Sequence, residues 1–107
     1  MNRNFLKSMT VITVMMCCTT INAKEFAVYS GFSCGSWIAN ETNMSRSWLL
    51  GYMSGLAYGS GKNVLTGTDK DSIFLWMKNY CNANPLEDVM VGGDMLFWEL
   101  MQKKGLK

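Results

Sequence analysis

The stretch GLAYGSGKN, residues 55–63, contains the glycines and the lysine that a phosphate-binding loop would use. The P-loop pattern requires glycine, four variable residues, glycine, lysine and then a serine or threonine that holds magnesium. Gly61 and Lys62 fit this pattern. Leu56, however, stands where the first glycine belongs, and Asn63 replaces the hydroxyl residue. Because the preceding residues have helical rather than strand periodicity, we do not expect the stretch to bind a nucleotide.

Few side chains in this chain are suited to acid–base catalysis. The sequence contains no histidine, which excludes Ser-His-Asp and Cys-His catalysis and removes a common zinc ligand. Two pairs of neighbouring carboxylates remain, Asp69 with Asp71 and Glu87 with Asp88. Both pairs lie where helices are expected to begin, and acidic residues there interact favourably with the helix dipole. We therefore expect no enzyme activity, no metal and no cofactor.

The N-terminal residues have the pattern of a secretory signal peptide. Arg3 and Lys7 precede an uncharged run over residues 9–20, and Ala23 ends a passable small-residue cleavage site. We expect residues 1–23 to be removed during export to the periplasm.

Two other interpretations of this N-terminal segment are weaker. The apolar run is shorter than the about 20 residues of a transmembrane helix, so we expect no membrane anchor in the mature form. Lipidation at Cys17 or Cys18 remains an alternative, although neither cysteine follows a small residue. Residues 24–107 are then expected to form one small helical domain.

Charge in the expected mature chain is balanced. Two of the ten basic residues, Arg3 and Lys7, lie in the signal peptide, and the remainder equal the eight acidic residues in number. Nucleic-acid binding requires a clustered basic face, and we expect none. Lys103, Lys104 and Lys107 are interpreted as cations that complete the dipole of the last helix.

Cys34 and Cys81 are the two cysteines of the expected mature chain. Two thiols in an exported protein most simply form one disulfide. Closing a loop of this span would remove roughly 4 kcal/mol of unfolded-chain entropy. The alternative, a reactive or metal-bound pair, lacks both a Cys-x-x-Cys spacing and a histidine.

Apolar residues at helical spacing predict an all-α domain. The first helix is expected from about Ser33 to Asn40, and the second is expected to begin with Ser45 as its cap. Residues 59–68 are polar except for Val64 and Leu65 and predict a loop, longer than the usual four to six residues. Long loops on a rigid scaffold often carry recognition, although a plain connector is equally compatible with this composition.

Two further helices are expected after this loop. Thr68 and Asp69 resemble a helix start, and residues 82–84 resemble its end. Asn84 as cap and Pro85 at the first helical position predict the start of the last helix. The predicted fold is a small bundle of about four helices with one long-range disulfide.

Gly51, Gly55 and Gly59 recur every four residues and line one stripe of the second predicted helix. Each glycine costs about 1 kcal/mol of helix propensity relative to alanine, so a packing benefit should offset the loss. Small residues at this spacing let two helices approach closely. We predict a close helix crossing at this stripe, inside the core of the domain.

The arrangement CGSWI, then WLLGYMSGLAYG, then TDKDSIFLWMKNYCNANPLEDVMVGGDMLFWEL resembles the Rap/Tai-type immunity proteins of bacterial type VI secretion systems. The resemblance spans about residues 31–101. Its most specific pieces are G-Y-x-S-G at residues 51–55 and Y-C-x-x-N-P at residues 80–85. Proteins of that family are periplasmic, helical, often dimeric and disulfide-bonded, and they block peptidoglycan amidase toxins.

The resemblance implies a role and a contact region for this chain. It implies a Cys34–Cys81 disulfide, a protein toxin as partner and a possible homodimer. Family inhibitors insert loop residues into the catalytic groove of the toxin, and the matching region here is residues 59–68. That segment has no fixed motif, so its expected contact residues follow from position and chemistry: Lys62, Asn63, Thr66 and Thr68.

Two rival functions belong to other classes. Acid-stress chaperones of the HdeA kind are also small, periplasmic and helical with one long-range disulfide, and they expose apolar surface at low pH. An enzyme is the weaker rival, because histidine and recognisable catalytic motifs are missing.

Overall fold

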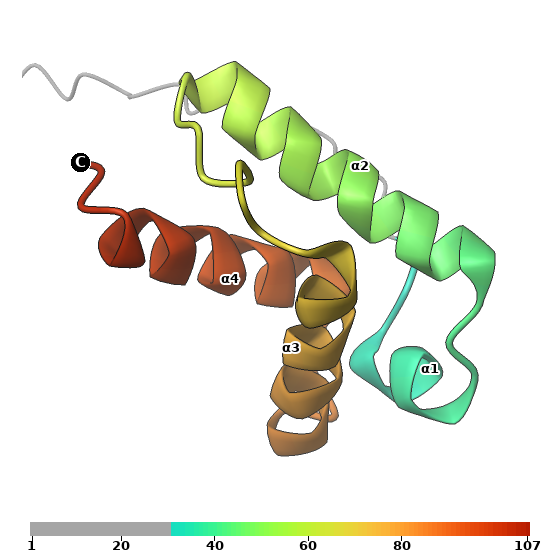
Figure 1. Cartoon of the computed structure of the whole chain (residues 1–107). Coiled ribbons are helices and arrows are strands. Elements are labelled where there is room, and N and C mark those ends of the chain that lie inside the picture. The colour runs from blue at the N-terminus through green and yellow to red at the C-terminus, as the bar shows by residue number, and fades with distance from the viewer. Residues whose placement is uncertain (1–30) are drawn as a thin grey trace, which may run out of the picture.

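The computed structural model describes residues 31–107 as four α-helices, with the longest connection between the second and the third (Figure 1). They are α1 (Cys34–Ala39), α2 (Asn43–Ser60), α3 (Lys70–Ala83) and α4 (Val89–Lys103). The predicted all-α class is therefore confirmed. The expected signal peptide, residues 1–23, lies outside the described residues. Within residues 31–107, no helix combines the length and apolar character that crossing a membrane requires.

Hydroxyl side chains start the first two helices. Ser33 accepts a hydrogen bond from the Ser36 amide at 3.1 Å and caps α1, so this helix starts close to the predicted residue. Helix α2 begins earlier than predicted, because its cap is Thr42 and not Ser45. The Thr42 hydroxyl accepts from the Ser45 amide at 3.1 Å, and the Ser45 hydroxyl accepts from the Thr42 amide at 2.9 Å. This reciprocal capping box places Ser45 inside the first turn.

The start of the last helix was predicted wrongly. Helix α4 begins at Val89, and Pro85 lies in a turn before it. The Cys34 amide donates to the Glu87 carbonyl at 2.8 Å, and the Val89 amide donates to the Phe32 carbonyl at 3.1 Å. These two bonds form a short antiparallel bridge. Because the bridge keeps the backbone extended, the helix starts only after it.

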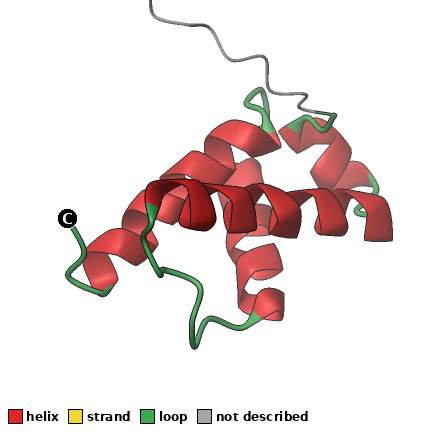
Figure 2. Ribbon diagram, turned by 90° about the horizontal axis from the view of Figure 1, so that it is seen from above, coloured by secondary structure: helices red, strands yellow, loops and turns green. Residues whose placement is uncertain are grey.

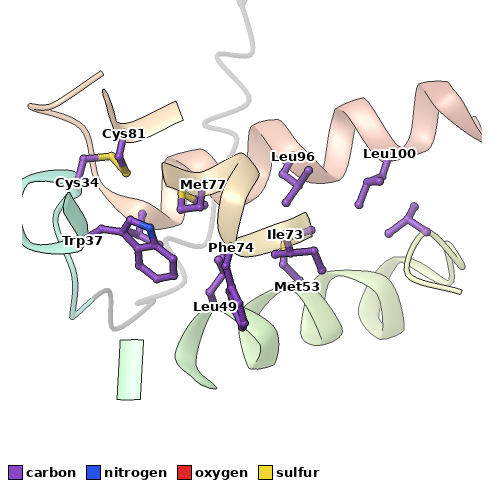
Figure 3. Packing of buried hydrophobic residues seen from close by; sticks show 12 residues of the cluster. Cys34, Trp37, Leu49, Met53, Ile73, Phe74, Met77, Cys81, Leu96 and Leu100 are labelled. Atoms are coloured by element: carbon purple, nitrogen blue, oxygen red, sulfur yellow. A yellow bond between two sulfur atoms is a disulfide. The ribbon is translucent and has the colours of Figure 1, made fainter. Parts of the chain in front are cut away.

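The four helices pack around one apolar core. Helix α2 packs against α4, and α3 packs against both α4 and α1 (Figures 1 and 2). Figure 3 shows side chains of α2, α3 and α4 meeting in one cluster, with the disulfide at its edge. The buried cluster consists of Cys34, Trp37, Leu49, Met53, Val64, Ile73, Phe74, Met77, Cys81, Val89, Leu96 and Leu100.

A disulfide joins Cys34 of α1 to Cys81 of α3, which confirms the predicted pairing (Figure 3). Both cysteines are fully buried, and their Cα atoms lie 4.8 Å apart. Helix α1 has only six residues, fewer than the about 12 to 15 that an isolated helix needs to be even marginally stable. The disulfide, the backbone bridge and the buried Trp37 side chain therefore hold α1 in place.

Two adjacent glycines on α4 allow its neighbours to come close. A Cβ added to Gly92 would lie 2.6 Å from the Met77 sulfur and 2.8 Å from Cδ1 of Tyr80, both on α3. A Cβ added to Gly93 would lie 2.9 Å from Cδ1 of Tyr52 on α2. The missing side chain of Gly92 therefore allows α3 to pack closely against α4, and the missing side chain of Gly93 allows α2 to do so.

The close crossing predicted at Gly51, Gly55 and Gly59 is wrong for the contacts among residues 31–107. A Cβ added to any of these glycines would meet no atom of that part of the chain within 4 Å. Helix α2 instead buries Leu49 and Met53. Gly51 follows Leu49 by two residues, about 200° around a helix, so the glycine stripe faces outward. The four-residue spacing identified a stripe but not the direction in which it points.

Candidate partner-binding site

Residues 61–69 form the loop between α2 and α3 and are called the contact loop below. Gly61 ends α2 in the left-handed conformation, with φ of 68°. The next amide, that of Lys62, donates back to the Ala57 carbonyl at 3.1 Å. This is the usual glycine-based helix ending. The glycine and lysine that resembled a nucleotide-binding loop thus belong to a helix C-terminus.

The contact loop is anchored to the helices at its centre. Val64 is 0% exposed and belongs to the buried cluster. Its carbonyl accepts a hydrogen bond from the Thr68 hydroxyl at 3.2 Å. The Lys104 amino group at the end of α4 donates to the Thr66 carbonyl. A loop with a buried anchor and a tether to α4 loses little conformational freedom when it binds a partner.

The structure places the four predicted contact residues at different depths. The Thr66 hydroxyl donates to the Asn63 side-chain oxygen at 2.6 Å, and both residues are exposed. Lys62 is half-buried beside them in the chain. The hydroxyl of Thr68 is engaged within the loop, so this residue is less available to a partner. Asn63 and Thr66 are therefore the exposed residues of the predicted set, with the half-buried Lys62 next to them in the chain.

A shallow hollow lies where the contact loop meets the end of α2. Its lining includes Ala57, Tyr58, Lys62, Asn63 and Leu65. The Tyr58 side chain is 93% exposed. An exposed aromatic ring next to an apolar floor and an amino group is typical of protein-binding surfaces.

A second hollow, of about 320 Å³, lies beside the other half of the contact loop. Thr68, Trp76, Glu99 and Lys103 are among its lining residues. The Trp76 indole N–H donates to the Glu99 carboxylate, and the Lys103 amino group lies 3.9 Å from the same carboxylate. The first half of the contact loop therefore lines one hollow, and its second half lines the other.

Both specific pieces of the resemblance have structural roles here. In the first piece, the Tyr52 hydroxyl donates to Asp94 of α4 at 2.5 Å, and its ring stacks on Trp48. In the second piece, Cys81 forms the disulfide, and the Asn84 side chain donates to the Tyr80 carbonyl at 3.0 Å at the end of α3. These residues hold the helices that carry the contact loop.

Burial raises the pKa of Tyr52 above its ordinary value of 10, and the hydrogen bond to Asp94 and the negative charge of Asp94 raise it further. Because the pKa of Tyr52 is higher in the folded state, its protonated hydroxyl stabilises the fold. This contribution to the free energy of unfolding is fully present below the unfolded-state pKa of about 10 and is lost as pH rises above it. We expect the folded protein to lose stability between about pH 10 and 11.5, and Tyr52→Phe to lose less over the same range. Urea denaturation at pH 8, 10 and 11.5 measures both, and equal losses would contradict the assignment.

Sequence reasoning missed two residues of this region. Lys104 was interpreted only as a helix-end cation, yet it tethers the contact loop. Tyr58 was not singled out, although it is the most exposed aromatic side chain of α2. The position of Tyr58 in the sequence could have indicated its exposure. It follows the apolar residue Leu56 by two residues, about 200° around a helix, and therefore lies away from the buried face.

The carboxylate pairs lie where helices begin, in two different ways. Asp69 caps α3 by accepting from the Ser72 amide at 3.2 Å, and of the two acids predicted in the first turn only Asp71 lies there. Glu87 and Asp88 precede α4 instead of lying in its first turn, and Asp88 makes no side-chain cap hydrogen bond. Over residues 31–107, no group of three or more potential ligands among His, Cys, Asp and Glu is placed to hold a metal ion.

No protein-family model, curated protein or solved structure matches this chain.

Proposed function

We propose that the protein is a periplasmic immunity protein that binds and inhibits a type VI secretion peptidoglycan amidase toxin and so protects the cell that produces it. The sequence resemblance and the signal-peptide pattern support the proposal. The buried Cys34–Cys81 disulfide is compatible with an exported protein and agrees with the pairing that the resemblance implies.

The anchored contact loop is the observation that carries this proposal. Val64 inserts into the core, and Lys104 tethers the loop to α4. Lys62 and Asn63 line a hollow together with Tyr58, whose side chain is exposed. The Thr66 hydroxyl donates to the Asn63 side chain and so lies next to this hollow. A rigid polar segment of this kind can enter a groove and block it at a low entropic cost.

The proposal predicts that a neighbouring gene encodes an exported peptidoglycan amidase, and the test uses that amidase and the mature protein. Binding is measured by calorimetry, and inhibition is measured as the cleavage of purified peptidoglycan. We expect stoichiometric inhibition. Changing Lys62 and Asn63 together to alanine should weaken binding at least tenfold, because truncating a hot-spot residue near the centre of an interface costs about 2 kcal/mol or more.

The chain contains a matched control for this double variant. Lys78 and Asn79 form the same dipeptide on the exposed face of α3. Changing both to alanine removes the same chemistry outside the contact loop and should leave the affinity unchanged. Equal effects of the two double variants, or an amidase that stays fully active, would contradict the proposal. Unchanged thermal unfolding confirms that both variants are folded.

The rival function, an acid-stress chaperone, predicts a different result from the same preparation. It predicts suppression of client-protein aggregation at about pH 2 to 3, no suppression at pH 7, and no inhibition of an amidase. That combination would replace the immunity function with the chaperone function.

A further inference from the structure

Lysines gather at the end of the molecule where the contact loop lies. The C-terminal ends of α2 and α4 lie at the same end in both views (Figures 1 and 2). The Lys104 amino group reaches the Thr66 carbonyl, and Lys103 lines a hollow together with Thr68. The last turn of α4 is therefore next to the contact loop. The lysines of this region, called the lysine end below, are Lys62, Lys103, Lys104 and Lys107.

Few carboxylates offset the charge of the lysine end. Asp69 and Glu99 both line the second hollow, and Glu99 also accepts the Trp76 indole N–H. Over residues 31–107, basic and acidic side chains are equal in number, so the rest of the domain carries a net negative charge. A neutral domain with separated charges presents a positive field at one end, and that field orients an approaching charged partner.

The surroundings of these lysines favour a protein partner over a nucleic acid or a membrane. One of them, Lys62, lines the hollow over Leu65 together with the exposed Tyr58, and this hollow offers a shaped apolar contact. Nucleic-acid-binding domains instead carry a net positive charge along a face or stripe. The described part of this domain has no net charge.

We propose that the lysine end docks onto an acidic protein surface and that its charge accelerates association with the partner. This inference rests on the proposed function, because it assigns the acidic surface to the rim of the amidase groove that the contact loop enters. Lys103 and Lys107 lie outside the contact loop and contribute by attraction at a distance. Charges at the rim of an interface act mainly on the association rate and its dependence on salt.

Association kinetics with the amidase test this inference separately from the proposed function. The association rate constant is measured at 20, 150 and 500 mM NaCl. We expect it to fall about tenfold over this range, because salt screens the attraction. Changing Lys103 and Lys107 together to glutamine should lower it at least threefold at 20 mM NaCl and reduce its salt dependence. Lys104 stays unchanged because it tethers the contact loop.

The control variant changes Lys70 and Lys78, two lysines of α3 outside the lysine end, to glutamine and should associate like the unmodified protein. Inhibition with a salt-insensitive rate constant, or equal effects of the two variants, overturns this inference and leaves the proposed function intact. If no amidase binds, the proposed function is wrong, and this inference is overturned together with it. Binding to phosphatidylglycerol vesicles or to a DNA duplex that requires Lys103 and Lys107 would overturn it in favour of a lipid or nucleic acid.

Discussion

Changing Cys34 and Cys81 together to alanine is expected to lower the free energy of unfolding by roughly 4 kcal/mol. The disulfide spans 47 residues, and a crosslink over a loop of that length restricts the unfolded chain by about this amount. Alanine is chosen because both positions are fully buried, where a serine hydroxyl would add the cost of an unsatisfied polar group. The free energy of unfolding of a domain of this size is about 5 to 10 kcal/mol, so the variant should be close to unfolding at 37 °C.

The loss should be greatest around α1. This six-residue helix depends on the disulfide, on Trp37 and on the backbone bridge to Glu87, and it is too short to persist alone. Guanidinium denaturation monitored by circular dichroism measures the global change, and hydrogen exchange of the α1 amides measures the local one.

Reduction is the control for the cysteine substitutions. The unmodified protein treated with a phosphine reductant should unfold at the same denaturant concentration as the double variant, and the double variant should not respond to the reductant. A variant within 1 kcal/mol of the unmodified protein, or a fully reduced protein with unchanged stability, would show that the crosslink does not stabilise the fold.

Gly93→Ala is expected to destabilise the protein by about 1 to 3 kcal/mol, the usual cost of inserting a methyl group into a packed interface. The new Cβ would lie 2.9 Å from the ring of Tyr52. That ring is restrained by its stack on Trp48 and by its hydrogen bond to Asp94. Relief of the overlap therefore requires α2 and α4 to move apart.

Gly92→Ala should act in the same direction at the contact of α4 with α3. Its new Cβ would lie 2.8 Å from the Tyr80 ring, which stacks on Trp76, and 2.6 Å from the sulfur of the fully buried Met77. The end of the Met77 side chain is flexible and can absorb part of the overlap. We therefore expect the smaller of the two losses at this position.

Gly55→Ala is the matched control and should have the opposite sign. Among the described residues, a Cβ there meets no atom within 4 Å, and alanine favours the helix by about 1 kcal/mol over glycine. Guanidinium denaturation of the three variants should show two losses and one gain of stability. A loss at Gly55 as large as the loss at Gly93 would restore the crossing that the sequence predicts at the α2 stripe.

Local features of the fold follow from short stretches of sequence. Helices α1 and α3 start close to the predicted residues, because a hydroxyl or carboxylate before a helical pattern satisfies free amides without help from distant residues. The Cys34–Cys81 pair was predictable because an expected exported chain left only two cysteines to combine. The all-α class followed in the same way from the spacing of apolar residues.

Tertiary contacts decided which positions those local signals serve. Pro85 resembles the first residue of a helix, yet pairing between Phe32 and Val89 delays α4. The glycines of α2 and α4 are alike as residue types, and only the neighbours of Gly92 and Gly93 make their missing side chains necessary.

Tertiary packing also decides which lysines lie together at the lysine end. Lys62 and Lys104 are distant in the chain, and their common location results from the packing of α2 against α4. The residue types of this chain settle its helices, its crosslink and its lack of histidine chemistry. The proposed binding surface depends on which helix faces meet, because helical periodicity repeats every turn and does not state which stripe faces which neighbour.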